Sequence, residues 1–218
     1  MIKSDDQFDR RSFIKKSSLM TLASSGLFTL SSTNVASAAS GQENDLIIGP
    51  KDGFTPQIGT LVSMLEYMRL VTLDSISNMS VDDLDYFVDP EANTIGGLIS
   101  HIISTEKWCQ IRTFDWKRSD IMNDRDKQAE DLGDDTRRSV KGNNFEFYQN
   151  EFEKVRKSTL NELANRNDDW LMEIDKNHHW GQPVNKYCEW FHVIEHECQH
   201  LGQISFIKKR FPVTKKVD

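Results

Sequence analysis

The sequence predicts an all-α protein, a four-helix bundle with a long connection between its second and third helices. Four stretches carry apolar residues at the three- and four-residue spacing of an amphipathic helix, and no stretch shows the period-two alternation of a half-buried strand. Such helices bury their apolar stripes against one another around a common core. We therefore expect one helical domain over residues 56–211, preceded by a linker or arm at 39–55 and followed by a tail at 212–218.

The first two helices are each defined by an apolar stripe and a start signal. Pro56 is expected to open the first helix, which continues over residues 57–78. Asn93 or Thr94 can cap the second, which covers the sequence TIGGLISHIISTEKWCQIRTF. The buried positions of the two helices follow from the spacing: Ile58, Leu61, Leu65, Met68, Leu73 and Ile76 in the first, and Ile95, Leu98, Ile99 and Ile102 in the second.

The chain between the second and third helices has a different composition. Residues 115–144 are dense in both signs of charge and contain few apolar side chains. We expect this connection to have little fixed structure and to be long enough to run the length of a bundle. The third helix is expected from about Asn144 to Asn165, and before the second helix the pair Ser80 and Asp83 has the spacing of a capping arrangement.

The fourth helix carries the strongest chemical signal in the chain. Its sequence, EWFHVIEHECQHLGQISFIKKR from Glu189 to Arg210, places His192, His196 and His200 at intervals of four residues. At about 100° per residue, these imidazoles lie on adjacent turns of one helix face. A pair of histidines four residues apart can share one divalent ion, with zinc or nickel the expected metal. A catalytic site takes three protein ligands, so a further ligand must come from elsewhere.

The candidate for the further ligand is His101. It lies beside the apolar stripe of the second helix, where packing alone does not favour an ionisable ring. The alternative is a buried histidine with one hydrogen bond. Glu106 follows about one and a half turns later, as a partner of a ligand, a general base or a surface charge. His178 and His179 are adjacent in an irregular, aromatic segment over residues 170–183, and we expect them to have a surface or packing role.

The segment His196-Glu197-Cys198-Gln199-His200 also matches HExxH, the helical signature of many zinc proteases. In those enzymes the glutamate activates water on the metal, which makes Glu197 a second catalytic candidate beside Glu106. The proteases take a third ligand from further along the chain, however, and residues 202–218 contain no histidine and no acidic residue except Asp218. A zinc protease is therefore our third interpretation.

Three segments resemble the DinB-like, or YfiT-like, metal-binding four-helix bundles, a superfamily related to thiol-dependent S-transferases. They are TLVSMLEYMRLVTLDSI, NTIGGLISHIISTEKW and PVNKYCEWFHVIEHECQHLGQI. The resemblance implies metal ligation by His101, His196 and His200, with His192 as an extra histidine that the pattern does not require. Leu201 stands where the family usually has arginine, a departure at the rim of the site.

The resemblance implies a metal-dependent enzyme of unknown substrate, either a transferase linked to a low-molecular-weight thiol or a hydrolase that uses metal-activated water. The alternative from another class is a non-catalytic metal-binding or stress-related envelope protein. Members of such bundle families often pair through helix faces, so a homodimer is one option.

The first 38 residues resemble a twin-arginine export signal. Arg10 and Arg11 precede Ser12-Phe13-Ile14-Lys15, residues 19–30 form a short apolar core, and Ala36-Ser37-Ala38 offers a cleavage site. The core is too short to span a bilayer. We therefore expect a periplasmic or secreted protein that is not stably inserted in a membrane after cleavage.

Charge and cysteine content exclude further classes of protein. The 218-residue chain has a formal charge of −7, and removal of the signal would take away five basic and three acidic residues. An acidic protein is not expected to bind nucleic acid or anionic membrane surfaces. The three cysteines, Cys109, Cys188 and Cys198, are an odd number, so a full disulfide framework is not expected. One pair and three free thiols both remain open.

Overall fold

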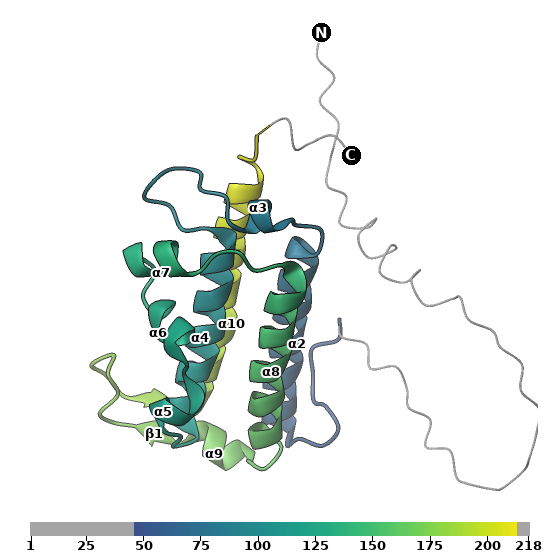
Figure 1. The fold of residues 1–218 in the computed structure, drawn as a ribbon. Coiled ribbons are helices and arrows are strands. Elements are labelled where there is room, and N and C mark those ends of the chain that lie inside the picture. Colours follow the sequence, from purple (N-terminus) through teal and green to yellow (C-terminus); the bar gives the residue numbers. More distant parts are fainter. Residues whose placement is uncertain (1–45, 213–218) are drawn as a thin grey trace, which may run out of the picture. The chain divides into compact units, whose positions relative to one another are not determined.

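Four long helices lie side by side in the computed structural model, which describes residues 46–212 (Figure 1). The fold is all-α, as the apolar stripes predict. The expected export signal lies outside the described residues. Around the bundle α10 packs between α2 and α4, and α4 packs between α10 and α8. The long helices are α2 (Pro56–Ile76), α4 (Ile95–Thr113), α8 (Phe145–Leu163) and α10 (Lys186–Lys208).

Side-chain caps fix where three of these helices begin. Thr94, rather than Asn93, caps α4, and its hydroxyl accepts a hydrogen bond from the Gly97 amide at 3.0 Å. Asn144 caps α8 and Asn185 caps α10 in the same way. Each cap satisfies a backbone donor that has no partner within its own helix. None of the described helices is long and apolar enough to cross a membrane.

The start of α2 is capped from a distant part of the chain. Asp168 opens the short helix α9 (Asp168–Met172), and its carboxylate accepts hydrogen bonds from the amides of Gln57 at 3.1 Å and Ile58 at 3.2 Å, and from the hydroxyl of Thr55. Burial alone would raise the pKa of Asp168, but these hydrogen bonds to the ionised form lower it. The contact joins the turn after α8 to the beginning of the bundle.

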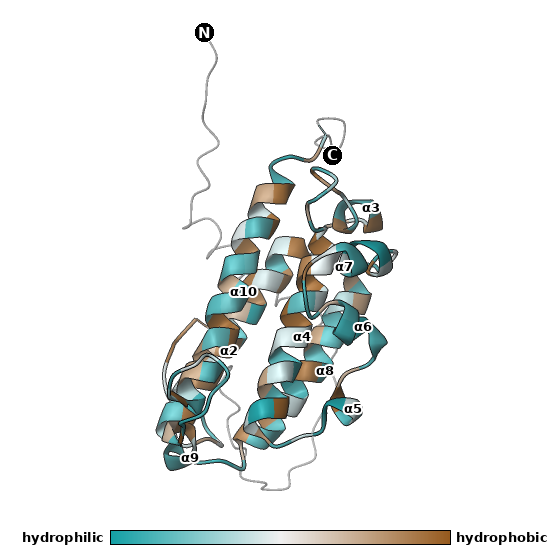
Figure 2. Ribbon diagram, turned by 90° about the vertical axis from the view of Figure 1, so that its left-hand side faces the viewer, coloured by the Kyte–Doolittle hydropathy of each residue, from teal (hydrophilic) through white to brown (hydrophobic). Residues whose placement is uncertain are grey.

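The expectation that residues 115–144 have little fixed structure is wrong. They form three short helices, α5 (Arg118–Ile121), α6 (Asp124–Gln128) and α7 (Asp134–Ser139), which pass along α4 from one end of the bundle to the other (Figure 1). Figure 2 shows that this segment is largely hydrophilic. It is nevertheless anchored, because a capping box starts α6 and three isolated apolar side chains are buried: Met122, Ala129 and Val140.

Short elements close the two ends of the bundle. Ser80 and Asp83 form the predicted capping box at the start of α3 (Val81–Leu84). At the opposite end lie α9 and a two-stranded antiparallel ribbon, β1 (Ile174–Asp175) and β2 (Val184–Asn185). The segment over residues 170–183 that we expected to be irregular therefore contains the end of α9 and β1. Strands of two residues are too short to show a period-two alternation in the sequence. The ribbon presents residues 176–183 as a loop beside the start of α10.

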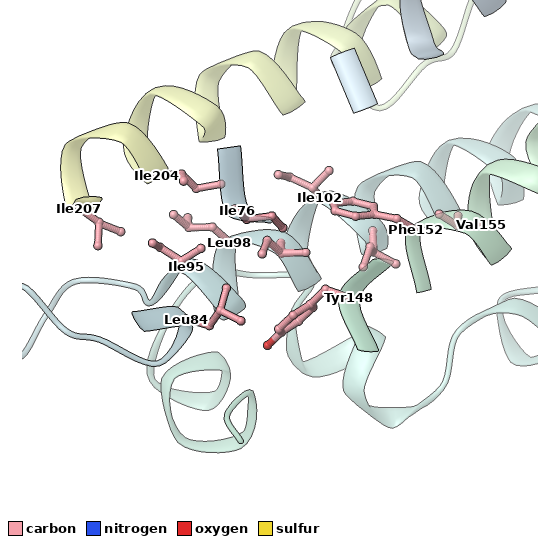
Figure 3. Packing of buried hydrophobic residues seen from close by; sticks show 12 residues of the cluster. Ile76, Leu84, Ile95, Leu98, Ile102, Tyr148, Phe152, Val155, Ile204 and Ile207 are labelled. Carbon is pink, nitrogen blue, oxygen red and sulfur yellow. The ribbon is translucent and has the colours of Figure 1, made fainter. Parts of the chain in front are cut away.

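The apolar core consists of two clusters. Figure 3 shows the cluster near α3, where side chains from several helices point toward one another. The second cluster lies toward α9 and includes the fully buried Trp190. The first cluster includes Ile76, Leu84, Ile95, Leu98, Ile99, Ile102, Tyr148 and Phe152; the second includes Ile58, Leu61, Leu65, Phe114, Leu163 and Trp190.

Four buried charged residues lie between the two clusters along the long helices, one on each. Arg69 of α2 donates to Glu106 of α4 at 2.8 Å and to Glu197 of α10 at 3.0 Å, while Arg156 of α8 donates to Glu106 at 2.9 Å. Burial alone would raise the pKa of Glu106, but the charges of Arg156 and Arg69 outweigh it and hold the pKa at about 2. This charged network therefore ties all four helices together in the ionised state.

Candidate metal centre

Three histidine rings from two helices converge between α4 and α10. The Nε2 atom of His196 lies 3.1 Å from Nε2 of His101 and 3.1 Å from Nε2 of His200. One ligand atom from each residue lies within 4.8 Å of the others. Two nitrogens bound to a single tetrahedral zinc ion at 2.0–2.1 Å are about 3.3 Å apart. The two separations from Nε2 of His196 are therefore close to those of a shared ion.

The hydrogen bonds on the far side of two rings determine which nitrogen carries the proton. Nδ1 of His101 lies 2.8 Å from the carbonyl oxygen of Ala129, and Nδ1 of His200 lies 2.8 Å from Oε1 of Gln203. Both oxygens can only accept, so each Nδ1 is the donor and each neutral ring keeps an unprotonated Nε2.

Two of the converging Nε2 atoms therefore offer lone pairs to the third ring, that of His196. A single proton on Nε2 of His196 cannot serve both neighbours well, whereas one cation can accept all three lone pairs. The donor set thus fits a divalent cation better than it fits a network of hydrogen bonds among the rings.

The surroundings keep these imidazoles uncharged. Burial, together with the neighbouring rings of His200 and His101, lowers the pKa of His196 to about 3. Burial also lowers the pKa of His101 and of His200, although the hydrogen bonds to Ala129 and Gln203 partly oppose the effect. A neutral imidazole is the form that binds metal, so near neutral pH protons do not compete strongly for the site.

The other three histidines lie outside this group. His192 is on the same face of α10, but its Nδ1 lies 3.0 Å from Oε2 of Glu195 and its ring centroid is 5.4 Å from that of His196. His178 is buried and its Nε2 lies 3.1 Å from Oε1 of Glu189, whereas His179 is exposed. Among the described residues, only His101, His196 and His200 form a group that could hold a metal.

Both glutamates proposed as catalytic candidates belong to the buried charged network. The carboxylate of Glu197 is paired with Arg69, and that of Glu106 with Arg69 and Arg156. Neither contributes an atom to the histidine group. The zinc protease interpretation needs Glu197 as a general base within hydrogen-bond reach of metal-activated water. Its pairing with Arg69 instead favours a structural role.

Sequence reasoning did not identify the two arginines of the charged network. Arg69 lies at a stripe position of α2, four residues after Leu65, and Arg156 lies beside Phe152 on the buried face of α8. A charged residue at a stripe position is the signal that could have identified each of them, because arginine is rarely buried without a partner. The partner itself cannot be read from spacing within one helix.

The three cysteines make no disulfide with one another. Cys109 is buried, Cys188 and Cys198 are exposed, and all three are free thiols. Burial raises the pKa of Cys109 well above its ordinary value. Of the two alternatives that the sequence leaves open, the structure therefore has three free thiols, and none of them belongs to the histidine group.

The fold and the convergent histidines together define a DinB-like four-helix bundle with a candidate metal centre between its second and fourth long helices. A family model described as mycothiol-S-transferase matches residues 60–211, and the chain belongs to this family. The matched region includes all three histidines and the four residues of the charged network. No curated protein matches the chain.

Proposed function

We propose that the chain is a metal-dependent enzyme that transfers a group to or from a low-molecular-weight thiol, with His101, His196 and His200 holding a divalent metal ion. The observation that carries the proposal is the pair of fixed tautomers, which directs lone pairs from His101 and His200 toward the third ring. Membership of the mycothiol-S-transferase family supports a thiol as one substrate.

The residues of the chain would act mainly by positioning. A bound divalent cation would lower the pKa of a thiol, or of water, at a free coordination position. The Ala129 carbonyl and the Gln203 amide hold two rings in the orientation that ligation requires. His101 and His196 are only partly buried, which leaves the group open to a small substrate from the solvent.

The test is a conjugation assay on protein loaded with zinc or nickel, using several low-molecular-weight thiols and an electrophilic acceptor. We expect thiol consumption that is lost after chelation, restored by metal and absent from His101→Ala. Cys198→Ala is the matched control, because it removes an exposed thiol of the protein itself and should leave the rate unchanged. Equal rates for His101→Ala and the parent protein, or metal-loaded protein that conjugates no thiol, would contradict the proposal.

We also propose that the chain is exported through a twin-arginine pathway. The support is the sequence RRSFIK at residues 10–15 and the small residues at 36–38. Replacement of both Arg10 and Arg11 by lysine should leave the protein in the cytoplasm, as measured by cell fractionation. Lys15→Arg with Lys16→Arg is the control and should be exported normally. The same distribution for the twin-lysine variant and the parent would exclude this route.

A further inference from the structure

We propose that Trp180 and His192 form one wall of the substrate site and bind a planar, uncharged apolar group of the substrate next to the metal centre. The inference rests on the proposed function, since it assumes a metal ion held by the histidine group. It concerns the loop at residues 176–183, which contributes no residue to that group.

Aromatic rings run in an unbroken row from this loop to the histidine group. The ring centroid of Trp180 is 5.2 Å from that of His192, which is 5.4 Å from that of His196. The rings of His196 and His200 are 4.3 Å apart. Because His192, His196 and His200 occupy successive turns of α10, the row follows one helix face. A substrate that binds at the metal and extends toward the start of α10 therefore meets His192 and then Trp180.

The loop that carries Trp180 is anchored through a buried histidine. His178 is 4% exposed, and its Nε2 lies 3.1 Å from Oε1 of Glu189 on α10 without forming a hydrogen bond. Glu189 in turn accepts a hydrogen bond from Nε of Arg112 on α4 at 2.7 Å. The backbone amide of Trp180 donates to Nδ1 of His178 at 3.3 Å. Trp180 is thus connected to both helices that supply the metal centre.

The two rings of the wall form a corner suited to a planar group. The planes of Trp180 and His192 are at 82°, and Nδ1 of His192 is engaged by Glu195. A planar group can stack on one ring of such a corner and contact the edge of the other, the two arrangements that aromatic pairs prefer. Trp180 is 39% exposed, so apolar indole surface remains available to a ligand. The guanidinium that anchors the loop, Arg112, is paired with Glu189, which favours an uncharged group over an anionic one.

The test measures binding to the metal-loaded protein and needs no turnover. Acetohydroxamate and benzohydroxamate chelate a metal through the same atoms and differ by a methyl and a phenyl group. We expect cobalt- or nickel-loaded protein to bind benzohydroxamate more tightly, as followed by the visible spectrum of the metal. Trp180→Ala should weaken the binding of benzohydroxamate roughly three- to tenfold, the range expected for loss of an aromatic pair. The affinity for acetohydroxamate should change by less than about twofold. Trp180→Phe should retain most of the preference for benzohydroxamate over acetohydroxamate.

Phe206→Ala is the matched control, because Phe206 is an exposed aromatic residue further along α10. It should bind both hydroxamates as the parent does. If the parent and Trp180→Ala bind metal equally and show the same ratio of affinities for the two hydroxamates, the proposed role of Trp180 is wrong. The proposed metal centre would be unaffected by that result. If the parent binds no metal, both proposals are overturned.

Discussion

His101→Ala is expected to lose stoichiometric binding of zinc and nickel, and His200→Ala is expected to do the same. Each replacement removes one of three ligands and leaves two, which are insufficient to complete a catalytic metal site. Loss of a residue that only orients a ligand costs about 10- to 100-fold in affinity. Loss of a ligand itself should cost more. Metal content is measured by elemental analysis of protein purified without a histidine tag.

Two further histidine variants serve as controls. His179→Ala removes an exposed ring outside the group, and His192→Ala removes the extra histidine of α10, whose Nδ1 is engaged by Glu195. Both should bind one metal ion per chain, as the parent does. Unchanged metal content in His101→Ala and His200→Ala would show that the ion is held elsewhere. Loss of metal from His192→Ala would add a fourth histidine to the ligand set.

Arg69→Met is expected to destabilise the fold by about 3–5 kcal/mol, the usual cost of removing one partner from a buried ion pair. The cost arises because Glu106 and Glu197 are 0% and 1% exposed, and Arg69 donates to both. Denaturant unfolding followed by circular dichroism gives the free energy of unfolding. Lys154→Met is the control. It removes an exposed ammonium group that donates a hydrogen bond to Glu151. This replacement should lower the free energy of unfolding by less than about 1 kcal/mol.

The same network predicts a pH dependence. The pKa of Glu106 is about 2 in the folded chain and has a reference value of 4.5. A carboxyl group with a lowered folded-state pKa stabilises the fold fully above its unfolded pKa, and this contribution is lost as pH falls through the folded value. The difference in stability between the parent and Glu106→Gln should therefore be constant above about pH 5 and decrease toward pH 2. A difference that is independent of pH across this range would contradict the ionised network.

The four long helices could be predicted from sequence because each depends on a local pattern. The apolar stripe, the cap at Thr94 and the proline at position 56 each act on residues only a few positions away in the sequence. The chain at residues 115–144 has no such stripe. Its order comes from isolated anchors such as Met122 and Val140, which are buried but belong to no repeating pattern in the sequence.

The candidate site could be predicted in part for the same reason. The spacing of His196 and His200 is a property of one helix, and His101 stood out as an ionisable residue beside an apolar stripe. The partners that fix the tautomers of His101 and His200 include a backbone carbonyl at Ala129, which no side-chain pattern marks. The pairing of Glu197 with Arg69 spans 128 positions of the sequence and depends on the packing of α2 against α10.

The central claim is that imidazoles of α4 and α10 hold one cation through their Nε2 atoms. Anomalous diffraction from crystals of the protein loaded with zinc or nickel tests it most directly. The account predicts a single anomalous peak bonded to Nε2 of His101, His196 and His200, with the Nδ1 hydrogen bonds of His101 and His200 retained. A peak coordinated by other residues, or by these rings through Nδ1, would contradict it.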